Sequence, residues 1–137
     1  MTSNKQGISK VEWGECRSKL LPIMAKTATR NSHDFTQQVD DALTNGSAFL
    51  FIADDGFMVL KPTTRNGVIW VTVMFAFNWG GDAISRYQSH IETMTRQIGG
   101  RGVELFTAVA ALSPILLDQG YSKAGEQDGI QHWQKVL

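Results

Sequence analysis

The stretch Val68-Ile-Trp-Val-Thr-Val-Met-Phe-Ala-Phe77, followed at once by Asn78-Trp79-Gly80-Gly81-Asp82-Ala83, decides the fold of this 137-residue chain. β-Branched and aromatic residues fill the first stretch, and such residues are enriched in strands. The stretch is much shorter than the roughly 20 apolar residues that a membrane helix needs. The sequence therefore predicts a long buried strand over residues 68–77 that ends in a glycine-containing turn.

A long helix is predicted directly after the turn, over residues 82–98. Apolar residues recur there at spacings of three and four, and Gly99 and Gly100 end the pattern. This spacing places one apolar stripe along a helix. The stripe consists of Ile84, Tyr87, Ile91, Met94 and Ile98.

Two shorter strands are predicted before the long one, over residues 48–53 and 57–61. Asp54-Asp55-Gly56 joins them, and the Asp-Gly pair tolerates the positive φ angles of tight hairpin turns. Pro62 is expected to close the second strand, and Asn66-Gly67 to form the next turn. The three strands are therefore expected to form an antiparallel meander.

Two helices are predicted ahead of these strands. Ser9 and Glu12 have the spacing of a capping box, so the first helix is expected to begin at Ser9 and to bend or end at Pro22. The second is expected over residues 34–45, with an acidic residue in its first turn and Gly46 as its stop. Residues 1–8 are expected to be flexible.

The sequence of the C-terminal part predicts a strand over residues 103–108, a short helix over 111–119 and a last strand over 130–137. The chain is expected to turn back toward the sheet from Gly120 and to form another strand before the last one. The complete order is α-α-β-β-β-α-β-α-β-β. This order predicts an α/β (α+β) fold with helices that flank a sheet. No linker divides the chain, so residues 1–137 are expected to form a single domain.

Composition excludes several classes of protein. The 13 Lys and Arg residues balance 13 Asp and Glu residues, so no excess basic charge favours nucleic acid as a partner. Cys16 has no second cysteine to pair with, which fits a reducing cytoplasm. No apolar N-terminal segment predicts a signal peptide, and no membrane partner is expected. The three histidines, His33, His90 and His132, are too scattered for a metal motif.

The element order and the turn resemble the GNAT superfamily, the Gcn5-related N-acetyltransferases, from about Val11 onward. The family usually has [Gln/Arg]-x-x-Gly-x-[Gly/Ala] at this turn. Gly81 and Ala83 match that pattern, and Asn78 replaces its first residue. The resemblance implies a mixed, mostly antiparallel sheet that is splayed between its central strands. It also implies acetyl-CoA (coenzyme A) as the cofactor.

The resemblance also implies a set of cofactor-binding residues. Small residues in the turn let backbone N–H groups approach a diphosphate, and the following helix directs its positive end at it. The backbone of the long strand would hydrogen-bond the pantetheine arm. The residues implied are Phe75, Ala76, Phe77, Asn78, Gly80, Gly81 and Ala83. Asp82 departs from this scheme, because its carboxylate competes with a phosphate for the helix end.

Residues 115–121 look like the family's Leu-Tyr-x-x-x-Gly-Phe segment. Leu116 stands where many members carry the Tyr that protonates the departing thiolate, and leucine cannot donate a proton. Ser113 is the remaining catalytic candidate, although a serine in that position is more often a helix cap. Tyr121 is expected to pack in the core.

Two functions follow from the resemblance. The first is an acyl-CoA-dependent N-acyltransferase, acting on an unknown small-molecule or protein amine. Water or a carboxylate would relay the amine proton; the candidate carboxylates are Asp54, Asp55 and Glu104. The alternative is a non-catalytic GNAT-like binding or assembly module, of the kind found in bacteriophage virions. Trp79 could line a ligand site, cover a sheet edge or bury in the contact of a homo-oligomer.

Overall fold

The computed structural model describes residues 7–30 and 35–137. Seven strands follow the hydrogen-bonded order β1-β2-β3-β4-β5-β7-β6, so the sheet is mixed and mostly antiparallel, as the sequence predicts.

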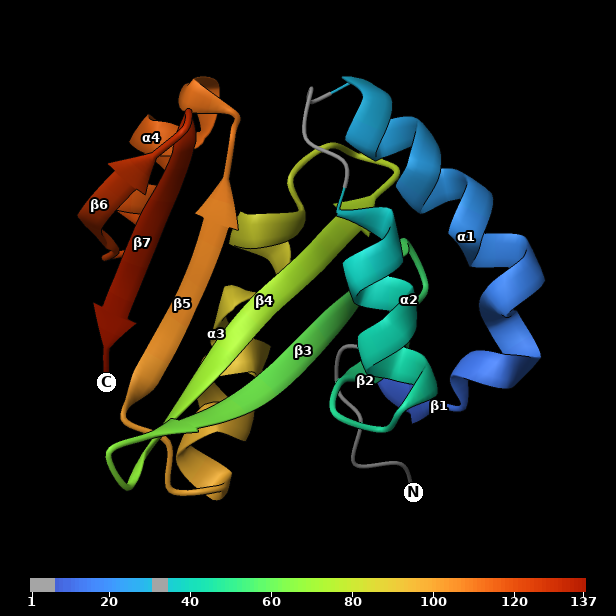
Figure 1. Ribbon diagram of the computed structural model, residues 1–137, viewed down its shortest axis with the longest axis horizontal. Coiled ribbons are helices and arrows are strands. Elements are labelled where there is room, and N and C mark those ends of the chain that lie inside the picture. The colour runs from blue at the N-terminus through green and yellow to red at the C-terminus, as the bar shows by residue number, and fades with distance from the viewer. Residues whose placement is uncertain (1–6, 31–34) are drawn as a thin grey trace. The chain divides into compact units, whose positions relative to one another are not determined.

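The chain divides into two compact units. The first unit contains Met1–Lys61 and Met74–Ala83, and the second contains Pro62–Val73 and Ile84–Leu137. The elements, drawn in Figure 1, are β1 (Ser9–Val11), α1 (Trp13–Arg30), α2 (Thr36–Thr44), β2 (Phe49–Ala53), β3 (Gly56–Arg65), β4 (Val68–Asn78), α3 (Ala83–Gln97), β5 (Gly102–Thr107), the 3-10 turn η1 (Ala110–Leu112), α4 (Ser113–Asp118), β6 (Ser122–Gln127) and β7 (Ile130–Val136).

The N-terminal residues of the first unit form a strand where the sequence predicts a helix start. Ser9 pairs with Ile52 in an antiparallel ladder between β1 and β2, so the capping-box prediction is wrong. Helix α1 begins only at Trp13. The ladder outweighs the local capping pattern, because it gives hydrogen-bond partners to backbone groups of β1 and to those along the edge of β2. Ile8 is buried, and residues 1–6 lie outside the described residues.

Helix α1 also runs through Pro22, which the sequence analysis expects to bend or end it. A proline inside a helix removes one backbone hydrogen bond and costs about 3 kcal/mol. The helix continues to Arg30 because its buried stripe continues: Leu20, Met24 and Ala28 recur every four residues and are all buried. Burial of this stripe offsets the missing bond.

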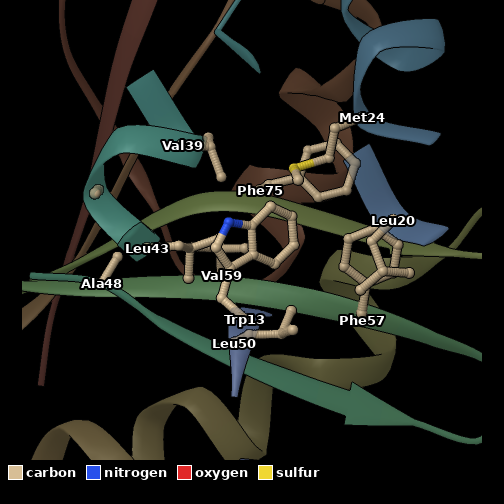
Figure 2. Packing of buried hydrophobic residues seen from close by; sticks show 11 residues of the cluster. Trp13, Leu20, Met24, Val39, Leu43, Ala48, Leu50, Phe57, Val59 and Phe75 are labelled. Atoms are coloured by element: carbon tan, nitrogen blue, oxygen red, sulfur yellow. The ribbon is translucent and has the colours of Figure 1, made fainter. Parts of the chain in front are cut away.

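The core of the first unit lies between α1, α2 and the strands, as Figure 2 shows. Phe57 and Phe75 come from neighbouring strands, and their ring centroids lie 5.2 Å apart. Helix α2 lies close to its predicted position and contributes Val39, Ala42 and Leu43. The acidic residue expected at its start, Asp34, lies outside the described residues.

A buried carboxylate joins the two helices of the first unit. Asp40 on α2 accepts hydrogen bonds from the Trp13 indole, at 2.9 Å, and from the Arg17 guanidinium, at 2.7 and 2.8 Å. The hydrogen bonds from Arg17 lower the pKa of Asp40 to about 2. This carboxylate therefore stays ionised over the whole range in which proteins usually fold.

The β2–β3 hairpin forms as predicted, but for a different reason. Ala53 pairs with Gly56, which leaves Asp54 and Asp55 as the turn, and neither of these nor Gly56 has a positive φ. Gly56 is required because a Cβ there would meet the Phe77 carbonyl oxygen and would lie 2.6 Å from the Asn78 Cα.

Strand β3 continues past Pro62 to Arg65, so the predicted strand end at Pro62 is wrong. The pairing of β3 with β2 ends at Leu60, so Pro62 lies beyond the part of β3 that needs an N–H donor on that side. The turn that follows is correctly predicted: Asn66 and Gly67 have φ angles of 54° and 77°.

The second unit contains the parallel pair of the sheet. Strand β4 pairs with β5 from Trp70↔Gly102 to Val73↔Leu105, and β7 pairs antiparallel with β5 on its other edge. Helix α3 buries Tyr87 and Ile91 of its predicted stripe. Ile98, the last residue of the predicted stripe, lies beyond the end of α3 and is 48% exposed, so it does not belong to the buried face of the helix. Among the described residues, no helix is long and apolar enough to cross a membrane.

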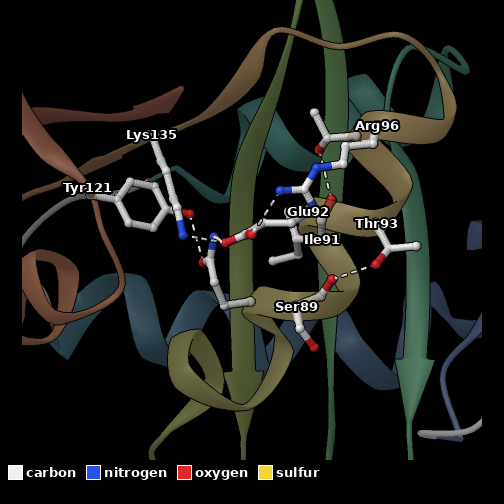
Figure 3. Close-up of polar contacts among 9 residues, drawn as sticks. Ser89, Ile91, Glu92, Thr93, Arg96, Tyr121 and Lys135 are labelled. Atoms are coloured by element: carbon white, nitrogen blue, oxygen red, sulfur yellow. Dashed lines mark hydrogen bonds and ion pairs between the residues drawn. The ribbon is translucent and has the colours of Figure 1, made fainter. Parts of the chain in front are cut away.

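A polar network ties α3 to the C-terminal strands of this unit (Figure 3). Lys135 on β7 donates to Glu92 at 2.6 Å, and Gln88 donates to the same carboxylate at 2.9 Å. The hydroxyl of Tyr121 donates to the Gln88 carbonyl at 2.9 Å. Gln88 and Glu92 of α3 thus find partners later in the chain, in Tyr121 just ahead of β6 and in Lys135 on β7.

We expect Gly56→Ala to lower the free energy of unfolding by about 1–3 kcal/mol, because the new methyl group meets backbone atoms that cannot move away. Gly14→Ala in α1 is the matched control. A Cβ at Gly14 meets no atom within 4 Å, so this change is expected to add up to about 1 kcal/mol of helix propensity. Urea unfolding of both variants measures the difference, and equal effects would contradict the close-approach argument.

Candidate functional site

The turn after β4 is held closed by the side chain of Asn78. This residue is 4% exposed, and its amide nitrogen donates to the carboxylates of Asp55 and Asp82. Its side-chain oxygen accepts the backbone N–H of Asp82 at 2.8 Å. Asn78, which the family resemblance places among cofactor contacts, therefore has its side-chain groups engaged within the turn.

The backbone of the turn is partly engaged as well. The N–H of Gly81 donates to the Asn78 carbonyl at 3.2 Å, and the N–H of Trp79 donates to the Asp55 carbonyl at 2.8 Å. Ala83 is the first residue of α3, so its N–H has no acceptor within the helix. One of the N–H groups expected to face a diphosphate, that of Gly81, already has a partner in the turn.

Gly81 keeps the conformation that such a turn needs. Its φ is 76°, and a Cβ at this position would meet no atom within 4 Å, so the space beside its backbone is open. At Gly80 a Cβ would lie 3.2 Å from a carboxylate oxygen of Asp82. The open side of Gly81 and the N–H of Ala83 fit a diphosphate, whereas the Asp82 carboxylate opposes its charge.

Strand β4, which leads into the turn, continues beyond the segment that pairs with β5. The register of β4 with β5 ends at Val73↔Leu105, while β4 runs on to Asn78. Phe75 is buried, and Ala76 and Phe77 are half-buried. Phe75, Ala76 and Phe77 belong to the same compact unit as Asn78, Gly80, Gly81 and Ala83.

Trp79 lines a cavity within the first unit. Its side chain is 67% exposed, and its ring meets that of Phe77 edge-on, with centroids 4.6 Å apart. Pro22, Ile23, Lys26 and Thr27 of α1 line the same cavity, which has a volume of about 260 Å³. The structure thus places Trp79 beside α1 at this cavity, and the three roles that the sequence leaves open for it stay predictions.

The predicted catalytic residue, Ser113, lies in the second unit. It is the first residue of α4, the N-cap position belongs to Leu112, and no side-chain cap hydrogen bond forms. Leu116 is fully buried. Tyr121 is buried, as expected, and burial raises the pKa of its hydroxyl to about 12, so it holds its proton at neutral pH.

Glu104, considered from sequence as a proton relay, is a buried structural carboxylate. Arg65 donates to both of its oxygens, at 2.8 and 2.9 Å, and Thr72 donates at 2.9 Å. Although burial itself raises the pKa of Glu104, these hydrogen bonds and the one from His132 lower it to about 2. A carboxylate this acidic is a weak base, so the structure argues against Glu104 as the relay.

His132 is the residue that the sequence analysis missed. Its Nε2 lies 2.9 Å from Glu104, and its ring stacks on Phe106 with centroids 4.3 Å apart. The pairing spans 28 residues, and the sequence contains no signal for it. Among the described residues, no group of three or more His, Cys, Asp or Glu side chains could hold a metal.

Comparison with known proteins supports this architecture at the level of fold. No family model and no curated protein matches the sequence, but solved structures do. A GNAT-family acetyltransferase from Listeria monocytogenes 4b F2365 aligns with 100% of this chain and 99% of its own, at a TM-score of 0.65 and 12% identity. The fold is that of the GNAT acetyltransferases.

Two further structures share this fold. The GNAT domain of S. lividans PAT aligns over 95% of this chain and 89% of its own, at a TM-score of 0.67 and 12% identity. A GNAT-family acetyltransferase from Brucella melitensis in complex with acetyl-CoA aligns over 91% of this chain and 84% of its own, at a TM-score of 0.59 and 14% identity. At such low identity the likeness shows the fold alone.

Acid should weaken the second unit through Glu104. Its pKa lies below the ordinary value of 4.5, so its contribution to stability is complete above that pH and is lost as the pH falls toward about 2. We expect a loss on the order of 2 kcal/mol over this interval. Thermal unfolding between pH 5 and about 2 should show a smaller acid-dependent loss in Glu104→Gln than in the parent protein.

Glu126→Gln provides the control for this experiment. The side chain of Glu126 is 46% exposed and forms a surface ion pair with Lys123, so the loss of its charge should leave the acid dependence unchanged. An unaltered acid dependence in Glu104→Gln would contradict the buried ion-pair argument.

Proposed function

We propose that the protein is an acetyl-CoA-dependent N-acyltransferase that transfers the acetyl group to an amine. The observation that carries this proposal is the course of β4: it passes the end of its parallel ladder at Val73 and enters a turn with left-handed Gly81 at the start of α3. The acetyl-CoA complex of the Brucella melitensis protein of the same fold supports it.

Binding would depend on backbone groups of the turn. Acetyl-CoA, when bound, supplies the acyl group as an activated thioester. The N–H at Ala83, the open side of Gly81 and the positive end of α3 would hold the diphosphate. The backbone of Phe75, Ala76 and Phe77 would orient the pantetheine arm beside β4.

A second candidate is a non-catalytic binding or assembly module with this fold, such as a bacteriophage component. The closed turn favours it, because Asn78 and the Asp82 carboxylate already satisfy groups that a diphosphate would use. Buried Leu116 favours it as well, since no proton donor occupies that position. The two candidates differ in whether acetyl-CoA binds at all.

We expect acetyl-CoA to raise the free energy of unfolding by about 2.7 kcal/mol at 100 times its dissociation constant. Thermal shift and calorimetry at increasing acetyl-CoA concentrations measure this effect. An absent shift at millimolar acetyl-CoA, with folded protein, would reject the enzyme and leave the module.

Variants of the turn test where the cofactor binds. Gly81→Trp should abolish the shift, whereas Gly99→Trp should keep it, because Gly99 has nearly the same φ, 75°, and equally open surroundings at the other end of α3. Asp82→Asn should tighten binding by removing a carboxylate from the phosphate position. Weaker binding of Asp82→Asn would show that the charge of this residue does not oppose the cofactor.

A further inference from the structure

The cavity that Trp79 lines is mostly apolar, and part of its wall is exposed to solvent. Its lining residues all belong to the first unit. They are Pro22, Ile23, Lys26, Thr27, Phe77 and Trp79, and we call this site the Trp79 cavity. Its volume of about 260 Å³ is below the roughly 300–1,000 Å³ of most small-molecule sites. The size therefore suits one side chain of a larger partner better than a whole small ligand.

Trp79 is held in place although it is exposed. Its ring meets the Phe77 ring edge-on, with centroids 4.6 Å apart, and its backbone N–H donates to the Asp55 carbonyl at 2.8 Å. Two-thirds of Trp79 still faces solvent. An indole that is already held loses little conformational freedom when a partner covers it, and Trp is enriched among the residues that carry most of a binding energy. Trp79 thus has the properties of a binding residue.

Pro22 belongs to the α1 wall of the cavity and is exposed. A proline inside a helix lowers the stability of that helix, and no burial of Pro22 itself compensates for this. Its ring and the Ile23 side chain form the apolar part of the α1 wall. The Thr27 hydroxyl donates to the Ile23 carbonyl at 2.9 Å, so its hydrogen is already engaged within the helix. Apart from Lys26, the cavity therefore offers mainly apolar contact.

The face of α1 that lines the cavity is basic. Lys26 lines the cavity itself, and Lys19 lies on the same helix face, four residues before Ile23 and seven before Lys26. Both lysines are exposed, and neither takes part in the ion pairs formed among the described residues. Glu15 shares this face but lies one turn further from the cavity. Two ammonium groups are thus available to a partner.

The carboxylates of the turn do not line the cavity. Asp55 and Asp82 both accept hydrogen bonds from the Asn78 amide, and neither is among the lining residues. The negative charge of the first unit near Trp79 therefore lies in the turn, and the positive charge lies on α1. An acidic ligand is attracted along α1, because the two lysines attract it while the turn repels it.

The spacing of the two lysines favours a peptide over a small molecule. Lys19 and Lys26 are separated by seven helix positions, which corresponds to about 10 Å along the axis. An extended peptide covers that length with about three residues. Such a segment places one side chain in the cavity and carboxylates at both lysines, whereas a single small carboxylate that fills the cavity serves only one of them.

We propose that the Trp79 cavity is a docking site for an acidic peptide segment of a partner protein. One apolar side chain of the segment enters the cavity, and carboxylates beside it pair with Lys19 and Lys26. Contact with Trp79 and Pro22 provides most of the affinity, and the charge pairs select acidic partners. The site uses the side chains of Phe77 and Trp79 and no backbone group assigned to acetyl-CoA, so it is independent of the proposed acyl transfer.

The first test titrates the peptide acetyl-Glu-Asp-Phe-Asp-Glu-amide into the protein without acetyl-CoA. Calorimetry measures its affinity, and the indole Nε1–H resonance of Trp79 should shift in a saturable way while those of buried Trp13 and Trp133 stay unchanged. Replacing the phenylalanine of the peptide with alanine, or its four acids with lysine, should each weaken binding at least about tenfold. No saturable binding at millimolar peptide, a Trp79 resonance that does not shift, or equal affinity for the acidic and basic peptides would overturn the proposal.

Variants of the protein test the two kinds of contact separately. Trp79→Ala should weaken peptide binding at least about 30-fold, whereas Leu117→Ala, which changes a residue that is 61% exposed in the second unit, should not. Lys26→Glu should weaken it at least about tenfold, whereas Arg101→Glu, which changes an exposed cation outside the cavity, should not. Unaltered affinity in folded Trp79→Ala or in folded Lys26→Glu would overturn the proposal.

Sedimentation velocity distinguishes a partner from a second copy of the chain. Any self-association of the protein should be unaffected by Trp79→Ala. A dimer that this substitution dissociates would show that a second copy covers the cavity, and it would overturn the proposal. Saturable peptide binding by a protein that does not bind acetyl-CoA would reject acyl transfer and keep the docking site.

Discussion

A carboxylate without exposed surface must find its partners inside the protein, and Glu104 imposes this condition on the second unit. A buried charge is tolerated only when it is paired and hydrogen-bonded. Its partners come from β3, β4 and β7: Arg65, Thr72 and His132. Because these side chains must converge on one point, Glu104 fixes both the register of the polar face and the orientation of the imidazole. Replacement of any one partner would leave part of that charge unsatisfied.

The first unit meets a similar condition at the turn after β4. Asn78 bridges the carboxylates of Asp55 and Asp82 with one amide group, which keeps two negative charges close to a helix start. The proposed function would place a polyanionic cofactor at this turn, and the chain has equal numbers of acidic and basic residues. The turn therefore depends on backbone N–H groups for any attraction to phosphate.

The sequence was sufficient where a local pattern dominates. The apolar run of β4, the spacing of Tyr87 and Ile91 on α3, and the Asn66-Gly67 turn all predict the observed elements. Predictions failed where distant contacts outweigh local signals. Ser9 joins a ladder with β2, and β3 passes through Pro62 because its pairing with β2 has already ended at Leu60. The glycine turn of the candidate site was visible in the sequence. The pairing of Glu104 with His132 was not, because only the sheet brings them together.

The exposed Trp79 makes the turn observable by its own fluorescence. Trp13 and Trp133 are 6% and 3% exposed, and Trp70 is half-buried, whereas two-thirds of Trp79 faces solvent. A polar quencher such as iodide reaches exposed indoles far more readily than buried ones. The emission that iodide removes therefore comes chiefly from the indole next to the candidate phosphate position. The protein carries an intrinsic optical reporter at the segment on which its two candidate functions differ.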